Sequence, residues 1–226
     1  MHTFAPLKNL FESSKKLVLD FSKIDATTPD IENFQKIFDK YFQKDINPRT
    51  PQNRQQINNA LIRDSGYRYL IGQYGEDRTA MLADTAAGKE GRVMHMAIDV
   101  FAIDLEPVYS PCDGYIVRSD YEEGFGEYGN YLILQPENED FYIFFGHLSW
   151  DKPAPGKISR GQKIAQLGDY IDNENGGWSR HLHIQILTEL PKEGSTPNGY
   201  STKKDYLRNA KKYPDPQKYF PGWKIQ

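Results

Sequence analysis

The sequence has little or nothing of several features that would point to other classes of protein. It has one cysteine in 226 residues, so it can form no intrachain disulfide and no multi-cysteine zinc knuckle. Its 28 lysine and arginine residues face 31 aspartate and glutamate residues, and no basic run occurs, so nothing favours nucleic acid as a partner. No apolar stretch approaches the roughly 18–20 residues that a membrane span requires. A nucleic-acid-binding protein and a helical membrane protein are therefore not expected.

The first twenty residues lack the apolar core of a signal peptide, because Lys8, Glu12 and Asp20 are among the charges that interrupt them. On this basis we expect a cytoplasmic protein, and the alternative is a cell-envelope protein that is exported by another route. What the chain does have is an ordinary charged fraction of 26% together with fifteen Tyr and twelve Phe. This composition predicts a folded, globular chain with an aromatic-rich core.

Residues 1–66 are predicted to form a helical N-terminal extension. The clearest helix begins at Thr28-Pro29-Asp30, where a hydroxyl N-cap precedes a proline at the first helical position. Its apolar residues over 28–46 follow a helical period, and a second, weaker helix is predicted over Pro51–Arg63. The apolar stripe predicts that helix 28–46 packs on the rest of the chain or on a second copy of it, which would make a homo-oligomer.

The sequence pattern of residues 67–190 is typical of a β domain. Residues 191–226 are a polar C-terminal extension that is expected to pack on it. That extension contains one helical candidate, Lys203–Lys212. Short β-prone segments separated by Gly, Asn, Asp and Pro clusters predict a mainly β fold, an antiparallel sandwich or barrel-like sheet. The predicted strands are Tyr67–Tyr74, Val93–Phe101, Pro107–Ser110, Gly114–Ser119, Tyr131–Gln135, Phe141–Phe145, Ile164–Leu167 and Leu182–Leu187. Cys112 is expected to be a small buried hydrophobe.

Four of the five histidines lie in this β-rich part. The run from His181 to Ile186 alternates strictly, so His181, His183 and Gln185 share one face of a strand. His95 and Asp99 would also share a face if Val93–Phe101 were one strand. Histidine nitrogen and aspartate oxygen are both ordinary zinc donors. Taken one at a time, these patterns favour surface histidines and a solvated aspartate over a metal site.

Together the patterns resemble the lysostaphin-type zinc metallopeptidases, endopeptidases that cut the peptide part of peptidoglycan. The matching motifs, in order, are His95-x-x-x-Asp99, Phe145-Gly146-His147-Leu148-Ser149 and His181-Leu182-His183. Supporting matches lie between them, as at Gly129-Asn130-Tyr131, and the whole resemblance covers about residues 90–190 with a leader over Tyr69–Arg78. The loop before the last motif, Glu174–Arg180, departs from the family's pattern. Within it Trp178 and Arg180 would contact substrate or Trp178 would pack on its own loop.

The resemblance implies a β-sheet catalytic domain of the duplicated hybrid motif type and one Zn²⁺ ion. It implies that His95, Asp99 and His183 bind the metal and leave one position open. His181 and His147 would be the catalytic residues: one accepts the proton of the attacking water, and the other orients that water or stabilises the oxyanion. Which of the two is the general base stays open.

The activity implied is hydrolysis of peptide bonds in peptidoglycan cross-links or muropeptides. One alternative is a catalytically inactive relative that binds peptidoglycan or regulates another hydrolase. Another is a phosphocarrier or lipoyl-like domain, which shares the fold but not the metal chemistry. Such a domain would not need Asp99 beside His95 and His183, and inactive relatives normally lack a ligand, whereas this chain has all three.

Overall fold

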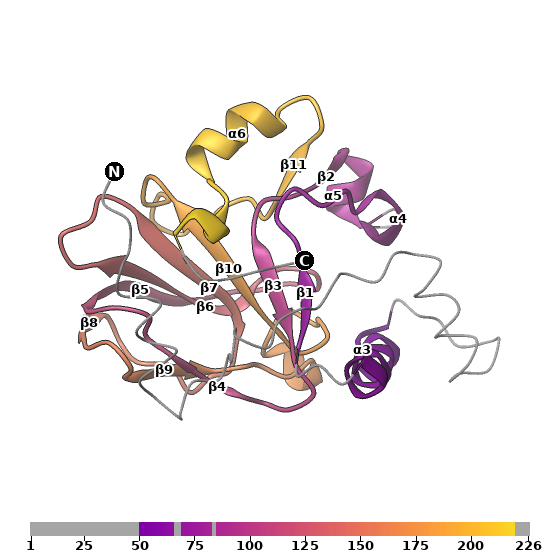
Figure 1. Cartoon of the computed structure of the whole chain (residues 1–226), viewed down its shortest axis with the longest axis horizontal. Helices are drawn as coiled ribbons and strands as arrows, with labels where there is room; N and C mark the ends of the chain where they lie inside the picture. The colour runs from indigo at the N-terminus through magenta and orange to yellow at the C-terminus, as the bar shows by residue number, and fades with distance from the viewer. Residues whose placement is uncertain (1–49, 66–68, 83–84, 220–226) are drawn as a thin grey trace.

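A computed structural model describes residues 50–65, 69–82 and 85–219 (Figure 1). The helix predicted over 28–46 lies outside these residues. The helical elements are α3 (Pro51–Ser65), α4 (Thr79–Leu82), α5 (Ala86–Lys89), η2 (Ile171–Asn173), α6 (Tyr206–Lys212) and η3 (Pro216–Lys218). The strands are β1 (Leu70–Gly72), β2 (Arg92–His95), β3 (Ile98–Phe101), β4 (Pro107–Tyr109), β5 (Gly114–Glu122), β6 (Gly129–Pro136), β7 (Tyr142–Leu148), β8 (Gly156–Ile158), β9 (Lys163–Gln166), β10 (His181–Leu187) and β11 (Tyr200–Thr202).

The centre of the molecule is a seven-stranded sheet in the order β1-β3-β10-β7-β6-β5-β8, with each neighbouring pair antiparallel. Two small antiparallel pairs accompany it, β4 with β9 and β11 with β2. In Figure 1 the β4–β9 pair lies on one side of the large sheet, and β11 with α6 lies on the other. The mainly β, antiparallel fold expected from the sequence is confirmed.

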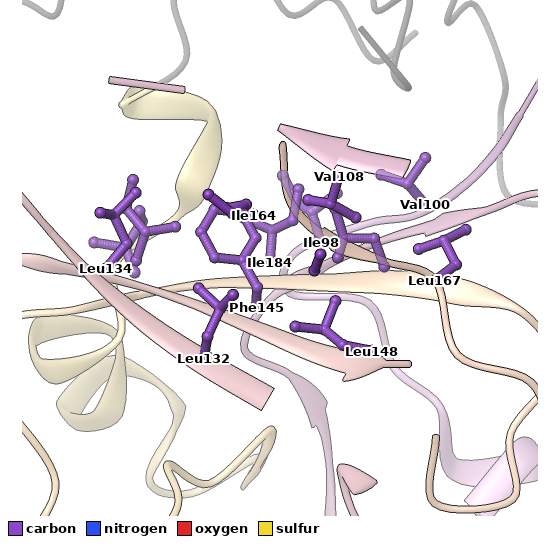
Figure 2. Packing of buried hydrophobic residues seen from close by; sticks show 14 of the residues in the cluster. Ile98, Val100, Val108, Leu132, Leu134, Phe145, Leu148, Ile164, Leu167 and Ile184 are labelled. Atoms are coloured by element: carbon purple, nitrogen blue, oxygen red, sulfur yellow. The ribbon is translucent and has the colours of Figure 1, made fainter. Parts of the chain in front are cut away.

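Both faces of the large sheet are covered. One face packs against the β4–β9 pair in an aliphatic core that includes Ile98, Phe145 and Ile184, and Figure 2 shows these side chains meeting Val108 and Ile164 from the second layer. Cys112 is buried in this cluster, as predicted. The opposite face, which carries the histidines, is lined by a second cluster of mainly aromatic residues. The strict alternation along β10 therefore directs aliphatic and imidazole side chains into two separate buried layers.

Helix α3 confirms the weaker of the two predicted helices. It has one buried face, in which Ile57, Leu61 and Ile62 pack against Leu70 of β1. Two polar residues of the helix are buried as well, and they reach the approach to β10, as described below. None of the helices in the described part of the chain is both long and apolar enough to cross a membrane.

The prediction of one strand over Val93–Phe101 is wrong. Strand β2 ends at His95, and a new strand, β3, begins at Ile98 in the large sheet. His95 instead pairs with Tyr200 of β11, and the backbone N–H of Met96 donates to Gly199 O. The chain changes sheets at this point because its two halves have different partners. His95 and Asp99 therefore approach each other across a break and not along one strand.

Other differences are smaller. Strand β11 was not predicted, because its polar residues in the C-terminal stretch carry no apolar alternation. Strand β8, Gly156–Ile158, was not among the predicted strands. The helix predicted over Lys203–Lys212 begins only at Tyr206.

Candidate metal centre

Three predicted metal ligands come together on the aromatic face of the large sheet. His95 lies at the end of β2, Asp99 on β3 and His183 on β10, and all three are buried. One donor atom of each lies within 4.8 Å of the others. His95 Nε2 is 3.3 Å from Asp99 Oδ2, and His183 Nδ1 is 2.9 Å from Asp99 Oδ1. Because β3 and β10 are hydrogen-bonded with Asp99 opposite His183, the sheet itself fixes this second pair.

The proton on His95 is placed by a backbone carbonyl. His95 Nδ1 lies 3.0 Å from the carbonyl oxygen of Gln73, which can only accept, so Nδ1 carries the hydrogen. Burial, followed by the nearby Arg78 guanidinium, lowers the pKa of His95, so the ring is neutral at pH 7. Its Nε2 then bears a lone pair, and that atom is buried with no hydrogen-bond partner among the described residues.

His183 is oriented by a side-chain amide. Gln185 Nε2 donates to the backbone oxygen of Asn198 at 3.1 Å, which directs Gln185 Oε1 toward His183 Nε2, also at 3.1 Å. Burial raises the pKa of Tyr128 well above its usual range, so the Tyr128 hydroxyl stays protonated and donates to the same Oε1 at 3.3 Å. In the tautomer with hydrogen on Nε2, which Gln185 Oε1 can accept, the imidazole of His183 presents the lone pair of Nδ1 toward Asp99; in the other tautomer Nδ1 donates to Asp99 Oδ1 at 2.9 Å.

Asp99 is the anion at the centre of the cluster. Arg78 Nη1 donates to Asp99 Oδ2 at 2.7 Å, and both side chains are buried. Burial by itself would raise the pKa of Asp99, but the neighbouring His95 imidazole and the Arg78 guanidinium hold it well below its usual range. Asp99 is thus ionised and can serve as a metal ligand at neutral pH.

The donor set fits a divalent cation. His95 Nε2, His183 Nδ1 and the Asp99 carboxylate present lone pairs to one another in a buried space, an arrangement that is repulsive unless a cation or a shared proton lies between them. Two imidazole nitrogens and one carboxylate are a usual protein ligand set for zinc, and each here has an outer hydrogen-bond partner that fixes its orientation. These three residues would hold the ion.

The two other predicted site residues, His147 and His181, lie beside this cluster. Their rings are 4.3 Å apart, centroid to centroid, and His181 Nε2 is 3.8 Å from Asp99 Oδ1. His181 Nδ1 lies 2.7 Å from the carbonyl oxygen of Ser179, and His147 Nδ1 lies 2.8 Å from that of Asn175. Both Nδ1 atoms therefore carry hydrogen, and both Nε2 atoms are acceptors while the rings are neutral.

Burial is the main cause of neutrality in both rings. It lowers the pKa of His181 to about 4 and, with the neighbouring His181 and His183 imidazoles as further causes, lowers the pKa of His147 well below its usual range. The two groups thus offer unprotonated nitrogens across the neutral pH range. Their Nε2 atoms can therefore accept hydrogen bonds from a water molecule near the metal donors.

His147 reaches this position through an irregularity in β7. Gly146 pairs with His183 on the site face, so regular alternation would direct His147 into the aliphatic core with Phe145. His147 instead has a φ of +62°, the pairing of β6 with β7 shifts beyond Leu132, and Leu148 occupies the core. A bulge of this kind re-aims a side chain, and such strained residues are concentrated at functional sites.

Residues of the loop before β10 bond mainly to other parts of the protein, and these contacts hold the backbone next to His181. Arg180 forms an ion pair with Asp169 at 2.7 Å, so it is engaged within the protein. From helix α3, Gln55 Oε1 accepts the N–H of Arg180, and Asn58 Nδ2 donates to Ser179 Oγ at 3.3 Å. The half-buried Trp178 donates to a backbone oxygen through its indole, and its ring lies 6.0 Å from that of His147. Trp178 is therefore hydrogen-bonded within the protein and also borders the site.

Sequence reasoning missed the outer partners of the ligands. Arg78 was seen only as the end of a family-like leader, and Gln185 only as a polar residue that shares a face with two histidines. The alternation in β10 was a usable signal for Gln185, because it places a third hydrogen-bonding group in the same buried row. No local signal identifies the Gln73 carbonyl or Tyr128, which reach the site through tertiary structure alone.

Replacing Gln185 with leucine should weaken zinc binding by about 10–100-fold, the usual cost of losing an outer partner of a metal ligand. The variant removes the acceptor that holds hydrogen on His183 Nε2, so Nδ1 is no longer kept free. Gln185→Glu keeps an acceptor at this position and is the matched control. Zinc affinity is measured by competition with a chelator. Unchanged affinity in the leucine variant would show that Gln185 does not orient His183.

The fold and the site define a mainly β protein with a buried His/His/Asp cluster suited to a divalent metal ion and two further histidines beside it. Residues 93–197, which include all five predicted site residues, match the model of peptidase family M23. The resemblance to the lysostaphin-type peptidases is thereby confirmed. Arg78 and Gln73 lie outside the matched segment.

Solved structures of peptidases are similar to parts of the chain. The catalytic domain of the antimicrobial peptidase lysostaphin from Staphylococcus simulans is 21% identical, with 62% of this chain and 92% of that domain covered and a TM-score of 0.43. The catalytic domain of the prophage-encoded M23 protein EnpA from Enterococcus faecalis is 15% identical over 48% and 75% of the two chains, with a TM-score of 0.37. A zinc-containing peptidase from Vibrio cholerae is 28% identical over 44% and 31%, with a TM-score of 0.35. No curated protein matches the sequence.

Proposed function

We propose that this chain is a zinc metalloendopeptidase that hydrolyses peptide bonds in peptidoglycan cross-links or muropeptides. The observation that carries the proposal is the convergence of His95, Asp99 and His183 within 4.8 Å, next to two neutral histidines with free acceptor nitrogens. The match to peptidase family M23 supports peptide hydrolysis as the reaction class. Peptidoglycan is proposed as the substrate because the chain resembles the peptidoglycan-cleaving lysostaphin-type peptidases.

The protein residues have separable roles in this chemistry. When bound, zinc supplies a Lewis acid that polarises the scissile carbonyl and makes water a usable nucleophile at neutral pH. His181 accepts the proton of the attacking water at Nε2, because Ser179 holds the other nitrogen protonated. The resulting imidazolium then gives that proton to the leaving amine.

His147 is placed to act on the same water. With Nδ1 committed to Asn175, the neutral ring of His147 has an acceptor at Nε2, so it orients the water in the ground state. It can donate to an oxyanion only after it has taken up a proton. The tautomers therefore favour orientation of the water over oxyanion stabilisation for His147, and they leave the two histidines able to exchange roles.

Metal analysis followed by a cleavage assay tests the proposal. Protein purified without chelator should contain one zinc per chain and should cut cross-linked muropeptides, since its three donors leave a position open for water. Well under half a zinc per chain, with no recovery when zinc is added, would count against a metal enzyme. One zinc per chain without cleavage would instead identify the inactive, binding-only relative.

A further inference from the structure

Arg78 is a buried cation beside the metal donors, and the proposed chemistry gives it no role. Its guanidinium donates to Asp99 Oδ2 at 2.7 Å and to the hydroxyl of Tyr200 at 3.2 Å, and its Nε lies 3.4 Å from a carboxylate oxygen of Glu76. The Arg78 and Asp99 side chains are only 4% and 2% exposed. A buried charge is costly unless it is paired, so each of these two groups depends on the other.

The sheet leaves space for this ion pair. Gly72 of β1 lies directly opposite Asp99 of β3. A Cβ atom on Gly72 would lie 2.3 Å from Arg78 Nη2, a distance that forces the guanidinium to shift, and 3.2 Å from Asp99 Cβ, which is a tight contact. The absence of a side chain at Gly72 thus allows the guanidinium to reach the carboxylate across the edge strand.

The segment from Gly72 to Arg78 is hydrogen-bonded to β2, the strand that carries His95. Arg78 N–H donates to Val93 O, and His95 N–H donates to Glu76 O. Gln73 O accepts from the ring of His95. The segment from Gly72 to Arg78 therefore contributes outer partners to two of the three metal donors, although it lies outside the span that matches the family model.

Arg78 differs from the other outer partners in one physical respect. The Gln73 carbonyl and the Gln185 amide are neutral, so they orient a ligand without opposing the charge of a metal ion. Arg78 carries a full positive charge close to the donors, and charges a few Å apart in a protein interior interact strongly even at an effective dielectric constant of about 20. Its charge offsets that of Asp99 when no metal is bound and repels a divalent cation that enters.

We propose that Arg78 is a resident counter-cation of Asp99, which keeps the metal-free site folded and, in return, weakens zinc binding. Removing the charge should destabilise the metal-free protein and tighten its hold on zinc. The part of the proposal that concerns zinc rests on the proposed function. The pairing in the metal-free protein does not.

The metal-free arm is a double-mutant cycle on the full chain stripped with a chelator. Arg78→Met should lower Tm on the order of 10 °C, because breaking a buried ion pair from one side leaves an uncompensated charge. In an Asp99→Asn background the same change should cost much less, because no charge is left to compensate. An equal loss of Tm in both backgrounds would show that Arg78 acts only through packing, and it would overturn the proposal.

The metal arm measures zinc affinity by chelator competition. Arg78→Met should bind zinc about tenfold or more tightly than the unaltered protein, since both the repulsion and the competition for Asp99 are gone. This sign is opposite to that expected for Gln185→Leu. Weaker zinc binding in Arg78→Met would overturn the proposal and make Arg78 an ordinary orienting residue.

Two further variants keep the result interpretable. Arg78→Lys retains the charge, so its zinc affinity should stay near that of the unaltered protein. If Arg78→Met does not fold, zinc affinity is measured on Arg78→Lys instead. Arg118→Met is the matched control, because that guanidinium donates to the carbonyls of residues 191, 192 and 195 and interacts with Tyr131, none of which is a proposed metal donor, so zinc affinity should not change. If the unaltered protein binds no zinc, the proposed function fails, while the metal-free cycle still decides whether Arg78 compensates Asp99.

Discussion

Replacing His181 or His147 with alanine should lower kcat by about 10²–10⁴-fold while zinc stays near one per chain. Neither imidazole is needed as a ligand, because the three donors of His95, Asp99 and His183 remain in place. The loss should appear in kcat more than in KM, since both groups act on charge that develops in the transition state. Muropeptide cleavage rates and metal content of the same samples provide the measurement.

The controls for this experiment are internal. His2→Ala removes a histidine that has no predicted role, so it should change neither zinc content nor turnover. If His181→Ala lost its zinc as completely as His183→Ala, the assignment of roles along β10 would be wrong by one pair of residues. Full activity in both the His147 and the His181 variants would contradict the proposed mechanism altogether.

Removing any one of the three metal donors should abolish zinc binding and cleavage together. His95→Ala and His183→Ala each delete a nitrogen donor, and two donors do not make a usual protein zinc site. Zinc content after gel filtration and cleavage rate should therefore fall in parallel. Retention of stoichiometric zinc by either variant would show that its histidine is not a ligand.

Asp99→Ala tests the metal donors less directly than the two histidine variants, because it changes stability as well as zinc binding. It also leaves the buried Arg78 guanidinium without its carboxylate, and breaking a buried pair in this way typically costs about 3–5 kcal/mol. Loss of zinc in this variant would thus be mixed with loss of stability. His95→Ala separates the two effects, because the pair of Arg78 with Asp99 remains intact.

Much of the fold follows from the sequence because its signals are local. The alternating apolar residues of β10 and the turn residues between short strands predict an antiparallel sheet with two different faces, and this is what forms. The histidine and aspartate motifs identify the residues that converge. Their spacing along the chain does not select them by itself; the resemblance to the lysostaphin-type peptidases does, because it joins the separate motifs into one set.

What the sequence could not predict depends on contacts between distant segments. The break after His95 occurs where the pairing changes from β11 to the large sheet. The bulge at His147 reverses the face that alternation predicts, and no residue type there requires it. The ion pair of Arg78 with Asp99 occupies the space beside Gly72, which lies opposite Asp99 in the sheet. Each of these features is a tertiary contact without a periodic signal.

The proposed substrate is tested most directly by digesting purified peptidoglycan sacculi with the zinc-loaded protein and identifying the products by mass spectrometry. We predict soluble fragments with new amino and carboxyl termini in the peptide cross-links, and none of these fragments with the His181→Ala variant at equal zinc content. Sacculi that release no new peptide termini, with a protein that holds one zinc per chain, would contradict the assignment of this site to peptidoglycan hydrolysis.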